Sequence, residues 1–311
     1  MGPDRLSTIQ ILRRKMLIQK PEPADKTKFA PDKNQLEAKY GLPREVRFCQ
    51  NCVYSNQKPN SASEFNHTNK SSKETVSFSK IGECEACSSI KLKQEVNWVE
   101  REQELRDLCD KYRSKDGTFD CLVPGSGGKD SIFASHMLKE QYGMTPLTVT
   151  FAPHIYTDWG WKNFNSWISS GLNNYLFSPN KLTQRLLTRL ALENLFHPFQ
   201  PFMMGQMYFP PKMAMLHNIK LVFYGENPTD YGNSTGEESP KKELRYFTKT
   251  DPNEQVFISG LPVQTLTKEF SLSKGDLSPY LPVEKESLLK SGIEVHYLGY
   301  YLKWHPQVVR R

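Results

Sequence analysis

The sequence predicts an α/β protein with a parallel sheet, preceded by a small cysteine-rich module. Three features support this: an apolar run entering a glycine-rich turn at residues 119–131, alternating strand-like and helix-like segments after it, and two Cys-x-x-Cys pairs before it. Strands that alternate with helices usually form parallel sheets with helices on both faces. We divide the 311 residues into a leader at 1–45, the cysteine module at 46–95 and the α/β domain at 96–311.

The leader is basic and has neither a helical nor a strand period. Residues 1–47 contain 11 Lys and Arg against 6 Asp and Glu, so most of the net charge of +7 lies there. Several prolines interrupt this segment, which favours an irregular conformation. We therefore expect a flexible leader, and no basic nucleic-acid-binding face on the α/β domain.

The remaining composition predicts a soluble cytoplasmic protein. Apolar residues make up 37% of the chain and aromatic residues 12%, enough for a hydrophobic core. No apolar stretch reaches the roughly 18 residues of a membrane span. Arg13, Arg14 and Lys15 stand where a signal peptide would need its apolar region.

Two cysteine pairs predict a metal site. Cys49 and Cys52 form the first Cys-x-x-Cys knuckle, and Cys84 and Cys87 form the second. Two such knuckles supply the four thiolates of a tetrahedral Zn²⁺ site, which would be structural because no coordination position stays open. The alternatives are disulfides, which the cytosol would reduce, or a redox pair. We expect the polar stretch at 61–79 between the knuckles to be an inserted loop outside the core.

The elements of the α/β domain follow from apolar periodicity. A charged helix is expected between Val96 and Arg113, followed by a buried strand at Phe119–Val123 and a helix at Ile132–Gln141. Further strands are predicted at Leu147–Phe151, Asn173–Phe177 and Ile219–Tyr224, and further helices at Lys181–Leu195 and at Pro210–Asn218, the latter with proline at its start.

The turn after the first strand is suited to binding a polyphosphate. It reads Ser126-Gly127-Gly128-Lys129-Asp130-Ser131. Two glycines allow the backbone N–H groups to approach phosphate oxygens, and the start of a helix adds about half a positive charge. The two serine hydroxyls and the lysine ammonium add further donors.

Two common phosphate loops do not fit this turn. A Walker A loop requires Ser or Thr where Asp130 stands and Gly where Val123 stands. A dinucleotide-binding loop requires a third glycine at Asp130. The turn instead resembles the PP-loop, SGGxDS, of the ATP-pyrophosphatase superfamily, whose members cleave ATP between the α- and β-phosphates. The resemblance implies that residues 126–131 hold pyrophosphate, with Asp130 linked to Mg²⁺; the alternative is a glycine-rich turn without a ligand.

Polar residues also follow two other predicted strands. Because the carboxyl ends of parallel strands share one edge, we expect these residues to lie near the turn, although each could also be an ordinary loop residue. The substrate or metal candidates are His154, Asn163, Glu226, Asn227 and Asp230. The catalytic candidates are Lys129, Asp130 and Glu226, and Thr150 joins the turn as an ATP-binding candidate.

A series of short segments points to a narrower family. The segments are Arg47-Phe48-Cys49-x-x-Cys52-Val53, Gly82-x-Cys84-x-x-Cys87, Trp98-x-x-Arg101, Tyr112-Arg113-Ser114, Asp120-Cys121-Leu122-Val123-Pro124, the SGGKDS turn, Pro146-Leu147-x-Val149-Thr150, Gly160-x-x-Asn163, Tyr224-Gly225-Glu226-Asn227 and Tyr300-Tyr301-Leu302-Lys303-Trp304. In this order they resemble the N-acetyl sugar amidotransferases of lipopolysaccharide and nonulosonic-acid biosynthesis, the WbpG/PseA-like group, over about residues 46–305.

The resemblance implies a specific reaction. ATP activates the acetamido carbonyl of a nucleotide-linked sugar, and ammonia replaces the oxygen to give an acetamidino sugar, AMP and pyrophosphate. Amide resonance makes the acetamido carbon a poor electrophile, so adenylylation of its oxygen is a reasonable first step. Lys129, the N–H groups of the turn and Mg²⁺ would neutralise the departing pyrophosphate, while Glu226 would hold Mg²⁺ or orient the sugar or ammonia.

The expected ammonia source is a partner. The second residue is Gly rather than a nucleophilic Cys, and no segment is left for a glutaminase domain. The resemblance suggests a glutaminase and barrel-protein pair similar to the HisH/HisF type. Relatives usually continue well beyond the Tyr-Leu-Lys-Trp segment, so we expect the α/β domain to be C-terminally truncated relative to that family.

Two rival functions stay open. PP-loop enzymes that thiolate tRNA would also suit a zinc knuckle, but many need cysteines after the loop, and the last cysteine here is Cys121, before it. A zinc-ribbon binding protein with a relic nucleotide fold would be favoured by loss of Lys129, Asp130 or Ser131, and all three are present.

Overall fold

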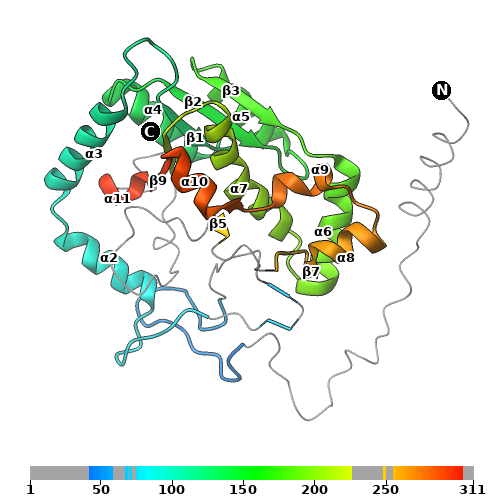
Figure 1. Cartoon of the computed structure of the whole chain (residues 1–311). Coiled ribbons are helices and arrows are strands. Elements are labelled where there is room, and N and C mark those ends of the chain that lie inside the picture. The colour runs from blue at the N-terminus through cyan, green and yellow to red at the C-terminus, as the bar shows by residue number, and fades with distance from the viewer. Residues whose placement is uncertain are drawn as a thin grey trace, which may run out of the picture.

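Five parallel strands form the central sheet (Figure 1), in the order β3-β2-β1-β4-β9. The computed structural model describes residues 42–58, 67–68, 70–71, 75–225, 248–249 and 255–303, so nearly all of the predicted leader lies outside it. The strands are β1 (Cys121–Pro124), β2 (Pro146–Phe151), β3 (Asn173–Phe177), β4 (Leu221–Tyr224) and β9 (Glu294–Tyr297). Their pairings are all parallel, which confirms the predicted fold class.

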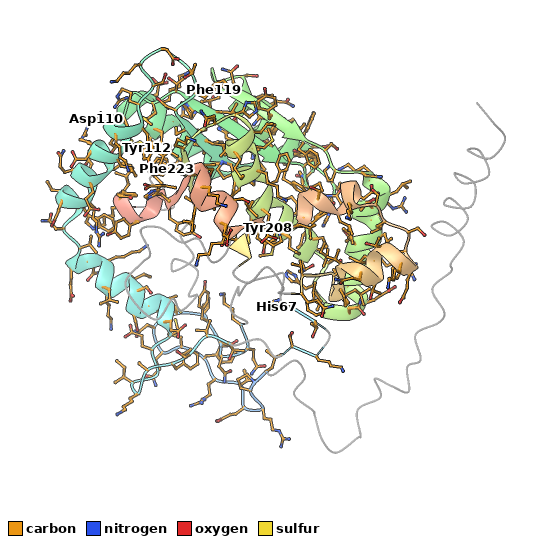
Figure 2. The ribbon with its side chains drawn as sticks, viewed as in Figure 1. His67, Asp110, Tyr112, Phe119, Tyr208 and Phe223 are labelled. Atoms are coloured by element: carbon orange, nitrogen blue, oxygen red, sulfur yellow. The ribbon has the colours of Figure 1, made fainter. Side chains whose placement is uncertain are left out.

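Helices cover both faces of the sheet (Figure 1). On one face, Leu122 and Val222 pack with α7 (Gln200–Leu216) and α10 (Lys285–Ser291). On the other face, Val123 and Phe223 pack with α3 (Trp98–Tyr112), α4 (Lys129–His136) and α11 (Leu298–Tyr301). The same cluster includes Tyr112 of α3, labelled with Phe223 in Figure 2. Burial on both faces explains why the β1 sequence shows no alternation.

The remaining elements complete the described chain. A π-helical turn, η3 (Met137–Gln141), extends α4, and α5 (Asp158–Ile168) and α6 (Lys181–Leu195) follow β2 and β3. Upstream, α2 (Glu85–Glu95) leads from the cysteine module to α3 (Figure 1). Smaller elements are β5 (Thr248–Lys249), β6 (Phe257–Ile258), β7 (Leu261–Pro262), β8 (Val283–Glu284), α8 (Val263–Glu269), α9 (Lys274–Leu277) and η5 (Ser278–Tyr280). Within the described ranges, the helices are too short or too polar to cross a membrane.

Most predicted elements are confirmed, but the helix predicted to begin at Pro210 is wrong in its start. Helix α7 begins at Gln200, so Pro210 and Pro211 lie inside it. Proline has no N–H group, and the carbonyls four residues earlier, those of Gln206 and Met207, therefore lose their helical donors. The hydroxyl of Tyr224, at the end of β4, lies 3.4 Å from the Gln206 oxygen and 2.9 Å from the Met207 oxygen. A strand residue thus shares its one hydroxyl proton between the two carbonyls that the prolines leave without helical donors, with the shorter contact to Met207.

Candidate functional site

The glycine-rich turn lies at the centre of the carboxyl edge of the sheet. It joins β1 to α4, and β1 is the strand from which β2 and β3 extend to one side and β4 and β9 to the other. Such a reversal of strand order creates a crevice where α/β proteins bind ligands. The N–H of Gly125 donates to the carbonyl of Val149 at 2.9 Å, and the Ser131 hydroxyl donates to the carbonyl of Gly128 at 3.0 Å. These bonds hold both ends of the turn.

Gly127 requires its glycine for two reasons. Its φ is +83°, a conformation that residues with a side chain rarely adopt. In addition, a β-carbon at this position would lie 2.7 Å from the backbone N and Cα of Phe164 on α5. Gly128 is exposed, and a β-carbon there would meet no atom within 4 Å. The turn is therefore packed against α5 on one side and open on the other.

The charged residues of the turn lie at the start of α4. The first N–H groups of a helix have no partner within the helix, and they carry a partial positive charge. Lys129 is the first residue of α4, and its Nζ lies 2.6 Å from Oδ2 of Asp130. The side chains are 35% and 13% exposed, respectively. Donors, an ammonium and a carboxylate therefore meet at one point, a combination that suits a polyphosphate accompanied by a divalent cation.

Trp167 is a supporting residue that the sequence analysis missed. A β-carbon at Gly125 would approach its ring to 2.9 Å, so the indole lies close to the start of the turn. Its Nε1 donates to the hydroxyl of Ser135 at 2.8 Å, which ties α5 to α4. The spacing of Phe164 and Trp167, three residues apart in α5, could have indicated Trp167 from the sequence, because residues at this spacing share one helix face and these two are the buried residues of α5.

The other candidates occupy different environments. Thr150 is fully buried, and its hydroxyl accepts a hydrogen bond from Nδ2 of Asn174 at 3.0 Å within the sheet. The ring of His154 stacks on that of Phe199 with centroids 6.0 Å apart, and burial lowers the pKa of this histidine. The backbone of Asn163 lies beside Gly127, so this residue does meet the turn. The functional roles of these residues stay predictions.

One group of candidates lies outside the described residues. Glu226, Asn227 and Asp230 follow β4 in the sequence. The last described residue before them is Gly225, which borders Asp130. The catalytic role of Glu226 therefore also stays a prediction.

The four knuckle cysteines form one cluster. Their Sγ atoms all lie within 4.8 Å of one another, with 3.9 Å between Cys49 and Cys87 and 3.5 Å between Cys52 and Cys84. All four are free thiols rather than disulfides. Zn–S bonds of about 2.3 Å in a tetrahedron place sulfurs roughly 3.8 Å apart, so the observed spacing fits Zn²⁺. The structure therefore confirms that the four cysteines lie together, as the predicted Cys₄ module requires.

The surroundings of Cys49 favour a thiolate. Burial opposes its ionisation, but the backbone N–H groups of Asn51 and Cys84 donate to its Sγ at 3.4 and 3.3 Å. Together with other donors they lower the pKa of Cys49 to about 6. Burial raises the pKa of Cys84 and that of Cys87, which makes a cation necessary if all four are to be thiolates. The donor set therefore fits a resident metal ion.

The expectation that residues 61–79 lie outside the core is wrong for the C-terminal part of this segment, which contains Val76 and Phe78. Val76 is 2% exposed and packs with Cys49 and Cys84, and Phe78 forms a β-bridge with Cys84. The physical reason is that two short knuckles bury little apolar surface by themselves, so the cluster needs apolar side chains from the segment between them.

Comparisons with known proteins give partial matches. No protein-family model matches the chain. An uncharacterized protein of Methanocaldococcus jannaschii is 30% identical over 83 residues, which make up 27% of this chain and 29% of that protein. The chain therefore spans less than a third of the length of this curated relative.

Three solved structures overlap with parts of the chain, each with a TM-score of 0.32. The NH₃-dependent NAD synthetase of Campylobacter jejuni is 15% identical, with 42% of this chain and 58% of that chain covered. A predicted subunit of tRNA methyltransferase from Methanocaldococcus jannaschii is 13% identical, covering 62% and 73%. The NMN synthetase of Francisella tularensis is 14% identical, covering 63% and 82%. Overlap at this level carries no functional conclusion, and the fold is defined by the strand order given above.

Proposed function

We propose that this chain uses ATP to convert an acetamido group of a nucleotide-linked sugar into an acetamidino group, with release of AMP and pyrophosphate. The observation that carries the proposal is the turn at the carboxyl end of β1. Gly127 is fixed against α5, and Lys129 and Asp130 are paired at the start of α4. This arrangement supports pyrophosphate binding in a loop that differs from Walker A.

The reaction has two steps. First, the acetamido oxygen attacks the α-phosphorus of ATP, a new O–P bond forms, and the bond to the bridging oxygen of the β-phosphate breaks, so pyrophosphate leaves. Ammonia then adds to the acetamido carbon and loses a proton, and the C–O bond breaks as AMP departs with the oxygen. The N–H groups of the turn and the Lys129 ammonium stabilise the charge on the leaving pyrophosphate.

Two cations belong to the proposal. Asp130, a residue of the turn whose side chain is 13% exposed, would hold Mg²⁺, which offsets phosphate charge when bound. Zn²⁺ at Cys49, Cys52, Cys84 and Cys87 would be structural, because the cluster supplies four ligands. Residues Asn163 and Glu226 are the proposed contacts to the sugar side of the site.

A partner supplies ammonia in this proposal, through a glutaminase and barrel pair of the HisH/HisF type. The cysteines of this sequence are unsuited to a glutaminase reaction, because four form the cluster and the other two, Cys109 and Cys121, are fully buried. Burial raises the pKa of Cys109 to about 12 and that of Cys121 well above its usual value. The same burial disfavours tRNA thiolation through these thiols.

The test supplies the full chain with a nucleotide-activated diacetamido sugar, ATP, Mg²⁺ and ammonium. Mass spectrometry should show NH in place of O in the sugar, and AMP and pyrophosphate should appear in equal amounts to the product. Asp130→Asn should lower kcat/KM at least about 100-fold. Asp116→Asn is the matched control, since Asp116 lies in the exposed turn between α3 and β1.

Two outcomes would contradict the proposal. Production of ADP and phosphate that depends on the sugar would exclude cleavage at the α-phosphorus. An unchanged sugar together with sulfur transfer to tRNA, given a sulfur donor, would favour the thiolation alternative.

A further inference from the structure

The two edges of the central sheet differ in how they are protected. Strand β9 forms one edge; three of its four residues are buried, and its Glu294 pairs with Lys111 of α3 at 3.2 Å. Strand β3 forms the other edge (Figure 1), and its five residues are exposed or half-buried. Tyr175 is 46% exposed and Leu176 is 42% exposed. An exposed edge strand pairs readily with another strand unless charges, prolines, a bulge or a covering segment prevent it.

Strand β3 carries no charge, proline or bulge of this protective kind. Residues 163–180 contain no Asp, Glu, Lys or Arg, although such residues make up 24% of the chain. Pro179 follows the strand, which ends at Phe177. The strand pairs with β2 residue for residue from Asn173 to Phe177, so the ladder has no bulge. Depletion of charged residues is typical of the centre of a protein interface.

The backbone of β3 presents hydrogen-bonding groups away from the sheet. The carbonyl of Phe177 accepts a hydrogen bond at 2.9 Å from the N–H of Ala152, the residue after β2. Because the backbone groups of successive strand residues point to opposite sides, Asn174 and Leu176 direct their N–H and C=O groups away from β2. Within the described ranges, no further strand pairs with that side of β3. Two donors and two acceptors therefore lie along this edge.

These four groups match those of a second copy of the same strand. When two β3 strands run antiparallel about a two-fold axis at Tyr175, Asn174 of one copy lies opposite Leu176 of the other. Each such pair exchanges two hydrogen bonds, so all four groups of each copy are paired. The two tyrosines lie opposite each other, and an aromatic pair across two strands contributes about 0.2–1 kcal/mol.

The side chains beside the edge are also suited to an uncharged partner. The ring of Tyr175 lies against that of His217, which follows α7, with centroids 4.9 Å apart. Leu216, the last residue of α7, is 74% exposed. Leu176 lies on the opposite face of the strand, because successive side chains alternate. Residues 163–180 offer no cation to a nucleic acid or an acidic peptide, whereas an identical uncharged edge fits them.

We propose that this chain forms a symmetric dimer by antiparallel pairing of β3 with β3 of a second copy. The two-fold axis is perpendicular to the joined sheets, so the carboxyl edges of the two copies point in opposite directions. Each glycine-rich turn remains complete within its own chain, and the inference is therefore independent of the reaction proposed there. A five-residue strand buries less than the roughly 800 Å² per partner of a standard interface, so dissociation in the micromolar range is expected.

Sedimentation equilibrium of the full chain at about 1–100 μM tests the association. The mass should rise from 35.9 kDa toward twice this value as the concentration increases. Leu176→Lys adds a charge to the edge, and Leu176→Pro removes an outward N–H, so each should weaken association at least about 10-fold. Leu289→Lys is the matched control, because Leu289 is 55% exposed on α10, which precedes the opposite edge strand. This control should dimerise like the parent.

Tyr175→Cys tests the register of the pairing. Directly opposed residues without mutual hydrogen bonds have Cα atoms about 4.5 Å apart in an antiparallel pair, within the roughly 4.4–6.8 Å range of a disulfide. Mild oxidation should therefore give a covalent dimer on a non-reducing gel, and Leu289→Cys should not. This result does not depend on the folding of the Leu176 variants, which circular dichroism checks.

Three results would overturn the proposal. The first is a parent chain that stays monomeric at about 100 μM. The second is dimerisation of both folded Leu176 variants as strong as that of the parent. The third is a Tyr175→Cys variant that cross-links no better than Leu289→Cys.

Discussion

Gly225 lies directly against the backbone of Asp130: a β-carbon on Gly225 would stand 2.5 Å from the Asp130 carbonyl oxygen. Gly225 follows β4, and Asp130 lies in the first turn of α4 after β1. The contact therefore joins the ends of the two strands at which the order of the sheet reverses. Only a glycine permits such an approach without movement of the backbone.

Gly225→Ala should consequently displace either the end of β4 or the start of α4. We expect a loss of about 1–3 kcal/mol in the free energy of unfolding, together with slower pyrophosphate release. Denaturation by urea and a pyrophosphate assay measure the two effects. Gly275→Ala in α9 is the control, because its nearest contact would be an ordinary 3.6 Å to the Ser273 hydroxyl. Unchanged stability and turnover in Gly225→Ala would refute the importance of this contact.

The geometry of the glycine-rich turn predicts that alanine at position 127 and alanine at position 128 will have different effects on stability. Gly127→Ala should destabilise the protein by about 1–3 kcal/mol, because it combines a positive φ with a clash against α5. Gly128→Ala should change the free energy of unfolding by less than about 0.5 kcal/mol, as an exposed position without a nearby atom. Thermal and urea unfolding of both variants give the comparison. Equal destabilisation at both positions would contradict the described geometry.

The cysteine cluster predicts one zinc ion per chain. Elemental analysis of purified protein should find it, and Cys84→Ser should lose it together with the fold of the module, because only three thiolates then remain. Cys109→Ala should retain zinc, since Cys109 is buried in the core of the α/β domain. A zinc-free parent protein, or a Cys84→Ser variant that stays folded and is insensitive to chelators, would exclude structural zinc.

Zinc binding should also depend on pH. In the metal-free protein the pKa of Cys49 is lowered to about 6, whereas the pKa values of Cys84 and Cys87 are raised. Protons compete with Zn²⁺ for every thiol, so affinity should fall as the pH decreases, and it should fall more steeply once Cys49 is also protonated below about pH 6. Competition titrations with a chromogenic chelator on both sides of this pH measure the slope. An affinity that does not vary with pH would contradict thiolate ligation.

The hydrogen bond between Tyr224 and α7 supplies a stability prediction. Tyr224→Phe should lower the free energy of unfolding by about 1–3 kcal/mol, because the Met207 carbonyl, and more weakly the Gln206 carbonyl, loses a donor in a partly buried position. Tyr175→Phe, on the exposed side of β3, should have little effect. Urea denaturation of the two variants tests the difference. A neutral Tyr224→Phe variant would show that another donor serves the proline-containing turn of α7.

The sequence by itself determined the features that depend on neighbouring residues. The strand-turn-helix at residues 119–136 was predictable because a buried run, two glycines and a helix start follow one another directly. The Cys₄ cluster was predictable because each Cys-x-x-Cys knuckle places two thiols together by local geometry. The helix at Lys181–Leu195 was predicted with its observed bounds, since its apolar spacing is regular.

The tertiary structure decided what depends on residues distant in the sequence. Strand β9 completes the sheet beside β4, although its four residues carry too little pattern to be recognised alone. Within helix α7, the carbonyls that Pro210 and Pro211 leave without helical donors are approached by the hydroxyl of Tyr224, which comes from a distant strand. The packing of Gly127 on Phe164 likewise depends on the tertiary structure. The sequence shows that a glycine stands at position 127 and would tolerate a close contact, but it does not show which atoms make that contact.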